Sequence, residues 1–246
     1  MENALLIGLS HQMALRRQMD VVANNLANVN TAGYKGDNLK FEEYIMPVAR
    51  MSELTEKDAR LSYVLDPLVY RNFNEGSFEQ TGNELDVAIK GDGWLAVQTP
   101  GGERYTRNGQ LKINAEGVLV DNSNNPVLGD GGPITFTADE AGIEIAADGT
   151  ISTTAGTKGR LRIVKFDSNA ALQKESETLF SSGTPATPVD NPHVVQGMVE
   201  RSNVNGTLEM TRMIETLRAY TNATQALEKT QELRRDAIER LGQTNV

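Results

Sequence analysis

The chain has 246 residues, enough for one large domain or two smaller ones, and 33 acidic against 24 basic residues give it a net charge of −9. This balance argues against a protein whose main partner is the phosphate backbone of a nucleic acid. The sequence contains no cysteine, which excludes disulfides, thiolate metal sites and cysteine nucleophiles. No segment approaches the roughly 20 apolar residues of a membrane helix, so we expect no direct membrane insertion.

The amino terminus differs from a cleaved secretory signal, because Glu2 stands where such a signal carries lysine or arginine. The apolar run from Ala4 to Leu9 is short and is followed by polar and basic residues. This pattern favours either a cytoplasmic protein or one that is exported by a route without a removable signal.

A helix is predicted from about Glu2 to Asn28, because this stretch lacks proline and carries an apolar stripe. The gaps along the stripe are 4, 3, 4 and 3, typical of a helix that packs against another helix. Its members are Leu15, Met19, Val22, Leu26 and Val29. Asn28, Asn30, Thr31 and Gly33 then provide a stop signal.

A longer helix is predicted after Gly206, with Asn203 and Asn205 as candidate caps. Its stripe also advances in steps of three and four: Met210, Met213, Leu217, Tyr220, Thr224, Leu227, Gln231, Arg234, Ile238 and Leu241. The simplest way to bury the stripes of the two helices is to pair them, either within one molecule or among neighbouring molecules. The pattern alone leaves both arrangements open.

Between the helices, short β-branched runs alternate with turn residues, which favours a sandwich or an irregular barrel. Leu85–Ile89 and Trp94–Gln98 are predicted strands joined by a hairpin-type turn at 91–93. The segment Ser181–Pro192, with its three prolines, is a predicted linker. The predicted fold class is α+β, with the terminal helices paired as a coiled-coil-like domain and a β-rich domain inserted between them.

The sequence offers little for catalysis or for a cofactor. His11 and His193 have no nucleophile context and are expected to be structural or exposed. Residues 121–125 and 130–132 are oxygen-rich, yet they lack the calcium-loop pattern, and polar turns explain them better. The turn at 91–93 has no following helix that could bind phosphate, and Trp94 is expected to be a core anchor. We therefore predict no catalytic, cofactor-binding or metal site.

Three separated motifs resemble those of the flagellar rod and hook proteins. The first runs from Asp20 to Lys35, the second includes Gly91–Trp94 and Tyr105–Gly109, and the third runs from Val195 to Tyr220. The family-motif residues are Asn24, Asn28, Asn30, Thr31, Gly33, Gly197, Ser202, Asn203, Asn205 and Arg218. The resemblance covers nearly the whole chain. Within the family, the opening residues 1–17 and the compact length favour a proximal over a distal rod subunit.

The resemblance implies a structural subunit of the periplasmic drive shaft, exported through the flagellum's own secretion channel and not an enzyme. Its implied partners are further copies of itself, neighbouring rod proteins and the flagellar export apparatus. The implied domains are an inner-tube domain of residues 1–30 and 193–246, a connecting segment of residues 31–65 and an outer β domain of residues 66–192.

The predicted assembly interface lies on the terminal helices. Its members are Leu15, Met19, Val22, Asn25, Leu26, Met210, Met213, Leu217, Tyr220, Leu227, Ile238 and Leu241. Two alternatives of other classes are an enzyme or secreted binding module with a helical stalk, and a cytoplasmic coiled-coil scaffold. An enzyme or binding module requires a concave site with convergent polar groups, for which the sequence supplies no set of residues.

Overall fold

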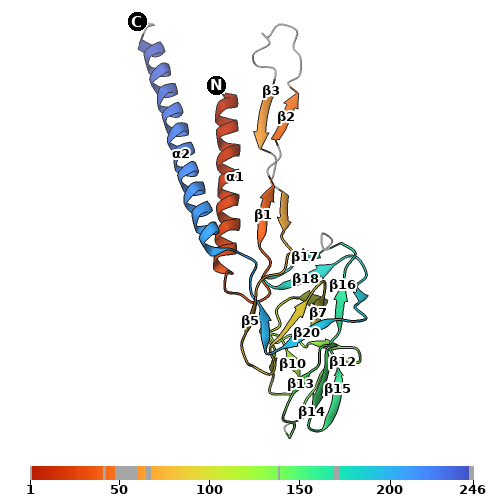
Figure 1. The fold of residues 1–246 in the computed structure, drawn as a ribbon. Helices are drawn as coiled ribbons and strands as arrows, with labels where there is room; N and C mark the ends of the chain where they lie inside the picture. The colour runs from red at the N-terminus through yellow and green to blue at the C-terminus, as the bar shows by residue number, and fades with distance from the viewer. Residues whose placement is uncertain are drawn as a thin grey trace. The chain divides into compact units, whose positions relative to one another are not determined.

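The computed structural model describes residues 2–40, 43–47, 60–64, 68–137, 139–168 and 172–243. A helix at each end and a β-rich middle make the fold α+β, as predicted (Figure 1). The chain divides into two compact units. The helical unit comprises Met1–Leu26, Asp37–Tyr70 and Gly206–Val246, and the β unit comprises Ala27–Gly36 and Arg71–Asn205. The backbone therefore passes between the two units four times.

The helices of the helical unit are α1 (Glu2–Ala27) and α2 (Gly206–Gln243). Glu209 in the first turn of α2 and Arg240 in its last turn complement the helix dipole. α1 ends just before Asn28, whose carbonyl accepts a hydrogen bond from the Thr31 amide at 3.1 Å. Val29, predicted to lie on the helical stripe, is therefore beyond the helix. Among the described residues, neither helix has the length and apolar character needed to cross a membrane.

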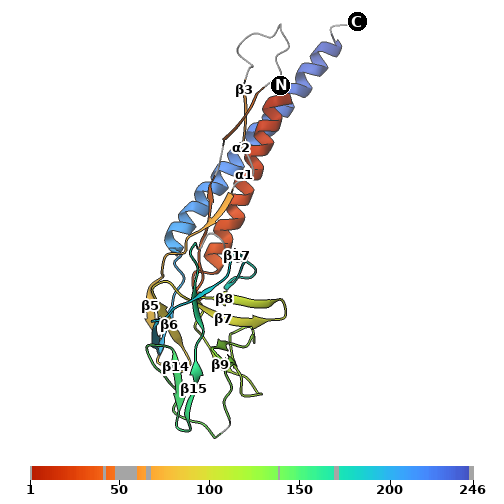
Figure 2. The same ribbon diagram turned by 90° about the vertical axis from the view of Figure 1, so that its right-hand side faces the viewer.

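The two helices lie side by side in both ribbon views (Figures 1 and 2). Gln12 Nε2 donates a hydrogen bond to Thr224 Oγ1 at 2.6 Å. Leu227 packs where Gly8 has no side chain, because a Cβ at Gly8 would lie 2.5 Å from Leu227 Cδ2. These contacts join the middle of α2 to the first half of α1.

Two two-stranded ribbons lie in and just after residues 31–65, the implied connecting segment. β1 (Asp37–Lys40) pairs with β4 (Leu68–Arg71), and β2 (Glu43–Pro47) pairs with β3 (Arg60–Val64). In the second ribbon Glu43 lies opposite Val64 and Pro47 lies opposite Arg60. Strands of four or five residues in two-stranded ribbons produce only a weak period-2 signal, so none of these four strands was predicted from the sequence.

The β unit consists of short strands. They are β5 (Phe78–Gln80), β6 (Val87–Lys90), β7 (Trp94–Thr99), β8 (Gly102–Thr106), β9 (Lys112–Ile113), β10 (Leu119–Val120), β11 (Leu128–Gly129), β12 (Gly132–Pro133), β13 (Glu144–Ile145), β14 (Thr150–Thr153), β15 (Gly156–Arg160), β16 (Ile163–Lys165), β17 (Leu172–Lys174), β18 (Leu179–Ser182), β19 (Thr187–Pro188), β20 (His193–Gln196) and β21 (Met198–Glu200). The largest sheet has the open order β17-β18-β8-β7-β16-β19. The strands that the structure describes thus form no closed barrel, contrary to one of the two predicted architectures.

The predicted hairpin of residues 85–98 is wrong. β6 pairs with β20, with Ile89 opposite Val194, whereas β7 lies between β8 and β16 in the six-stranded sheet. Gly91 adopts a φ of 84°, and the turn leads the chain from one sheet into another. A turn signal reports that the chain reverses, but it does not report which strand becomes the neighbour. β19 also lies within the predicted linker, where Pro188 pairs with Val164 at the edge of the large sheet.

Two buried clusters form the core of the β unit. The larger one is mostly aliphatic and includes Leu95, Val97, Ile151 and Leu161. The smaller one is centred on Trp94, whose ring is 5.1 Å from that of Phe180 and 5.8 Å from that of Phe73 between centroids. Trp94 is 2 % exposed, so the prediction that it anchors the core is confirmed.

Candidate assembly interface and polar clamp

The twelve predicted interface residues fall into groups that differ in burial. Those buried are Leu15, Val22 and Asn25. Those half-buried are Met19, Leu26, Met213, Tyr220 and Leu227. Those exposed are Met210, Leu217 and Ile238. The remaining one, Leu241, lies in the last turn of α2, and its side chain is outside the described residues. The helix pair within one chain therefore covers some of the predicted interface and leaves other parts of it to solvent.

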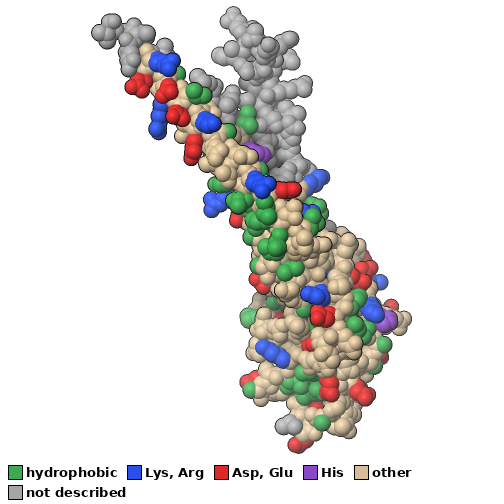
Figure 3. Space-filling view, turned by 60° about the vertical axis from the view of Figure 1, so that its left-hand side comes forward, with side chains coloured by type: hydrophobic (Ala, Val, Ile, Leu, Met, Phe, Trp, Pro, Cys, Tyr) green, Lys and Arg blue, Asp and Glu red, His purple; other side chains and the backbone are tan. Residues whose placement is uncertain are grey.

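The exposed apolar residues near the start of α2 form one row. Met210, Ile214 and Leu217 follow one another at steps of four and three, which places them on the same stripe of the helix. They are 50 %, 53 % and 52 % exposed. Figure 3 shows hydrophobic side chains gathered over this part of α2. We call these three residues the outer row. A contiguous apolar row marks an interaction surface more strongly than isolated exposed leucines do.

The carboxyl-terminal part of α2 extends well past its contacts with α1. The 38 residues of α2 span about 57 Å and the 26 residues of α1 about 39 Å, at 1.5 Å per residue. Every side chain from 228 to 240 is exposed, including Leu233 at 69 % and Ile238 at 62 %. This part of the helix therefore has no cover from the described part of its own chain.

Asn25 has an intramolecular role in the helical unit. Its Nδ2 donates to the Asp37 carbonyl at 2.8 Å, and its Oδ1 accepts from the Asp37 amide at 3.0 Å. The same Nδ2 lies 3.4 Å from Glu209 Oε2, and Arg212 Nη1 donates to Glu209 Oε1 at 2.6 Å. These four residues line a pocket of about 250 Å³. Asn25 thus ties α1, β1 and the first turn of α2 together.

Most of the family-motif residues belong to the β unit, in the segments that follow α1 and precede α2 along the chain. Asn28 is buried, and its Oδ1 accepts a hydrogen bond from the Thr31 hydroxyl at 3.0 Å. Gly197 adopts a φ of 73°, and its amide donates to the Asp86 carbonyl at 2.8 Å. Ser202 is buried and accepts from the Val204 amide at 3.3 Å. The exposed members of the set are Asn24, Asn30, Asn205 and Arg218.

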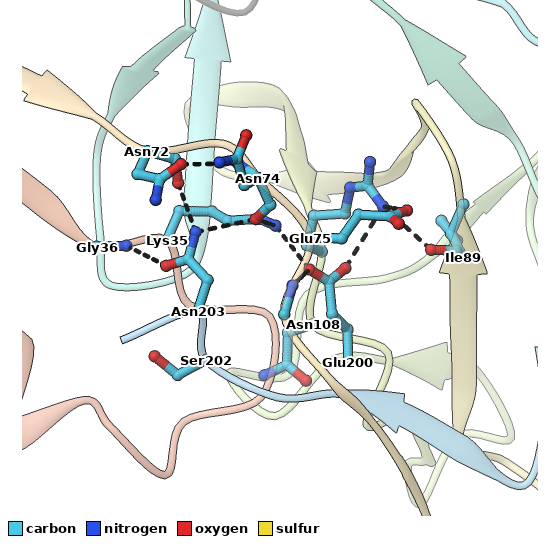
Figure 4. Close-up of polar contacts among 12 residues, drawn as sticks. Lys35, Gly36, Asn72, Asn74, Glu75, Ile89, Asn108, Glu200, Ser202 and Asn203 are labelled. Carbon is cyan, nitrogen blue, oxygen red and sulfur yellow. Dashed lines mark hydrogen bonds and ion pairs between the residues drawn. The ribbon is translucent and has the colours of Figure 1, made fainter. Parts of the chain in front are cut away.

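A buried ionic cluster in the β unit joins the three motifs. Lys35 Nζ lies 2.6 Å from Glu200 Oε1, and these two side chains are 0 % and 1 % exposed (Figure 4). Arg107 Nη1 is 3.4 Å from Glu200 Oε2 and donates to the Ile89 carbonyl at 3.1 Å. The Arg107 guanidinium also lies 5.4 Å from the Trp94 ring. A single buried carboxylate thus receives one cation from the first motif and one from the middle motif.

Asn203 connects the same segments through backbone groups. Its Oδ1 accepts from the Gly36 amide at 2.9 Å, and its Nδ2 donates to the Asn72 and Asn74 carbonyls at 2.7 and 2.9 Å (Figure 4). We call Lys35, Arg107, Glu200 and Asn203 the polar clamp. Because a buried polar group without a partner is costly, this degree of pairing favours a single arrangement of the segments.

Gly33 and Gly76 allow the segments around the clamp to approach closely. Gly33 has a φ of 69°, its amide donates to the Glu200 carbonyl at 2.8 Å, and a Cβ there would overlap the backbone of Arg107 and Asn108. A Cβ at Gly76 would overlap the Arg201 carbonyl oxygen. Both positions therefore require glycine.

Burial determines the electrostatics of the clamp. Desolvation lowers the pKa of the Lys35 ammonium, the ion pair with Glu200 opposes this shift, and the nearby Arg107 cation adds to it. Desolvation also lowers the pKa of Arg107, against the opposing effects of Glu200 and Glu75. In both cations, burial therefore disfavours the charged form, and the Glu200 carboxylate stabilises it.

Sequence reasoning missed the clamp as a unit, although the motifs contain its members. Lys35 and Glu200 are 165 residues apart, so no local spacing relates them. The available signal was that each of the three motifs includes a charged residue, namely Lys35, Arg107 and Glu200, close to glycine, serine or asparagine.

The described residues contain no group of three or more His, Asp or Glu side chains that could hold a metal. The 121–125 segment is a polar turn, as predicted. Asp121 Oδ1 accepts from the Ser123 and Asn125 amides, each at 2.8 Å. His11 and His193 are both exposed.

The described part of the chain thus exposes the apolar outer row on α2 and joins its three motifs through buried polar contacts. Three family models match the chain: the flagella basal body rod protein at residues 5–35, the flagellar hook protein FlgE/F/G D1 domain at 88–153 and the flagellar basal body rod FlgEFG protein C-terminal at 195–240. The chain belongs to the flagellar basal-body rod protein family. Members of this family are structural proteins of the flagellar basal body and not enzymes.

The relatives include two subgroups. The chain is 40 % identical to the flagellar basal-body rod protein FlgF of Caulobacter vibrioides, over 100 % of both chains. It is 34 % identical to FlgF of Mesorhizobium japonicum, over 98 % of this chain and 99 % of that one. It is 32 % identical to the rod protein FlgG of Agrobacterium fabrum, over 88 % of this chain and 91 % of the relative.

Proposed function

We propose that this chain is an FlgF-type proximal subunit of the flagellar rod. The observation that carries the proposal is the match to the Caulobacter vibrioides FlgF, in which the alignment covers 100 % of both chains. The second candidate is an FlgG-type distal subunit, favoured by the matches to FlgG proteins such as that of Agrobacterium fabrum. In either role the chain assembles with other rod proteins in the basal body.

In this proposal, the terminal helices pair with those of neighbouring copies and rod proteins. They form the inner tube around the export channel, and the β-rich part lies outside. The terminal helices within residues 1–30 and 193–246 supply the inner tube, residues 31–65 the connecting segment and residues 66–192 the outer domain. The proposal also includes export through the flagellar export apparatus, a periplasmic position in the rod and transmission of torque.

The outer row supports the role of the helices. Fully burying one side chain of leucine size contributes roughly 1.5–3 kcal/mol, so a neighbour that covers the exposed half of Met210, Ile214 and Leu217 gains a part of that at each position. A contact between two different surfaces of identical copies generates a filament when its rotation does not close into a ring. The exposed end of α2 offers further area to such a neighbour.

Leu217→Asp tests the assembly role. Because Leu217 is half exposed, the change should leave the isolated chain folded while placing a charge in the proposed interface. We expect concentration-dependent polymerisation of the wild-type chain, followed by light scattering and sedimentation, to be lost in the variant. Asn222→Asp is the matched control, because it adds the same charge at an exposed polar position of α2. Normal polymerisation of Leu217→Asp would show that the outer row is not part of the interface.

A complementation experiment separates the two rod positions. The chain is expressed in a strain that lacks its FlgF and, separately, in a strain that lacks its FlgG, and swimming and rod assembly are scored. The proposal expects rescue of the first strain only. Rescue of the second strain alone would assign the chain to the distal rod.

A further inference from the structure

Three segments of the β unit continue along the chain into the helical unit. Gly36 is followed by Asp37, Arg71 follows Tyr70, and Asn205 is followed by Gly206. Lys35 and Asn203 of the polar clamp lie within two residues of the first and the third passage, and Asn203 donates to the carbonyl of Asn72, the residue after Arg71. The clamp therefore lies close, along the chain, to three of the four points at which the backbone passes between the two units.

The clamp bonds the three segments to one another more than to the sheets. Glu200 Oε1 accepts from both Lys35 Nζ, at 2.6 Å, and the Gly76 amide, at 3.0 Å. Lys35 Nζ also donates to the Asn74 carbonyl at 2.8 Å. Hydrogen bonds of the Glu200, Lys35 and Asn203 side chains thus link segments 33–36, 72–76 and 200–203 to one another.

Backbone hydrogen bonds also link the same three segments. The Asn72 amide donates to the Gly36 carbonyl at 2.9 Å, and the Arg201 amide donates to the Ser77 carbonyl at 2.8 Å. Each segment is therefore bonded to both of the others. Buried charged groups that share a carboxylate lose their compensation when one member leaves, so opening one segment destabilises the contacts of the other two.

We propose that the polar clamp makes the attachment of these three segments all-or-none, with Glu200 and Lys35 as its positioning residues. The segments then open together or not at all, and none detaches alone under load. This inference deepens the proposed function and depends on it only for the source of the load. The cooperativity itself is a property of the isolated chain.

Native-state hydrogen exchange of the full chain tests this cooperativity. The reporters are the amides of Gly33, Gly36, Asn72 and Gly76, each with a protein acceptor in one of the three segments. Lys35→Met removes none of these four hydrogen bonds, because Lys35 Nζ bonds only the Asn74 carbonyl and Glu200. An effect on the reporters must therefore pass through the clamp.

We expect Lys35→Met to speed the exchange of all four reporters together by at least about tenfold, with the Ala96 and Gln98 amides of the large sheet unchanged. Lys158→Met is the matched control, because it removes another lysine ion pair of the β unit, with Glu140. Unchanged reporters, or a change at a single reporter, would overturn the proposal.

A milder variant tests the proposal even if Lys35→Met fails to fold. Asn203→Ala removes a half-buried side chain that bonds the Gly36 amide and the Asn72 and Asn74 carbonyls. It should also speed the exchange of Gly33 and Gly76, which it does not bond; unchanged rates at both would refute all-or-none attachment. Because exchange is measured on the monomer, failure of polymerisation would count against the proposed function alone.

Discussion

The Lys35 ammonium lies 2.6 Å from the Glu200 carboxylate, with neither side chain more than 1 % exposed. The pair joins the segment after α1 to the segment before α2 within the β unit. A buried ion pair of this kind is not in itself strongly stabilising, since desolvation offsets most of the Coulomb attraction. Its contribution is to favour one arrangement of the segments, because losing one partner leaves an uncompensated buried charge.

Because of Lys35, we expect the free energy of unfolding of the β unit to change with pH in the alkaline range. Burial holds the pKa of the folded ammonium below its ordinary value of 10.5. Between the lowered pKa and about 10.5 the unfolded chain binds more protons at this site, so the contribution of Lys35 to the free energy of unfolding rises with pH across that window and then levels off. Denaturant unfolding of wild type and Lys35→Met, followed by Trp94 fluorescence, measures this contribution as a difference. A difference that stays flat or falls across the window would contradict the prediction.

Gly33→Ala should strongly destabilise the β unit. A methyl group there would overlap the backbone of Arg107 and Asn108, and alanine disfavours a φ of 69°. We expect a loss of about 2–5 kcal/mol in the free energy of unfolding. Gly131→Ala is the control, because a Cβ at Gly131 has no atom within 4 Å. Equal stability of the two variants in denaturant titrations would show that the close approach at Gly33 is not required.

The pairing of α1 with α2 can be tested by cross-linking, since the chain has no native cysteine. Gln12→Cys combined with Thr224→Cys places thiols at the two positions joined by a 2.6 Å hydrogen bond. A short bismaleimide should link them within one dilute monomer and change its mobility on a denaturing gel. The control pair, Gln12→Cys with Thr230→Cys, has its second thiol on an exposed part of α2 and should react far less. Equal yields from the two pairs would mean that the helices are not held side by side.

The helices could be predicted because their signals are local. The proline-free stripe of α1 and the stop at Asn28, like the start of α2 after Asn205, depend only on neighbouring residues. The partner of a strand is not local, and the 85–98 hairpin failed for that reason. β6 pairs with β20, which is a hundred residues further along the chain, and no turn signal carries that information.

The candidate site was predictable only in part. The spacing of α2 identified apolar stripes, but it could not tell which members one chain would cover by itself. Met213 and Leu227 are partly covered within the chain, whereas Met210 and Leu217 are exposed, at 50 % and 52 %. The polar clamp depends on contacts between Lys35, Arg107 and Glu200 that only the folded chain brings together.

The β unit is built from two separate stretches of the chain, and this affects how such chains can diverge in sequence. Residues 27–36 fold with 71–205, although another part of the chain separates them. A recombination event at a single point within 37–70 would join a Gly33 and Lys35 from one parent to an Arg107 and Glu200 from the other. The hybrid would retain this buried packing only if the two parents matched at these positions. Inheritance of the first 36 residues is thereby coupled to that of the β-rich middle, and the two are expected to change in concert.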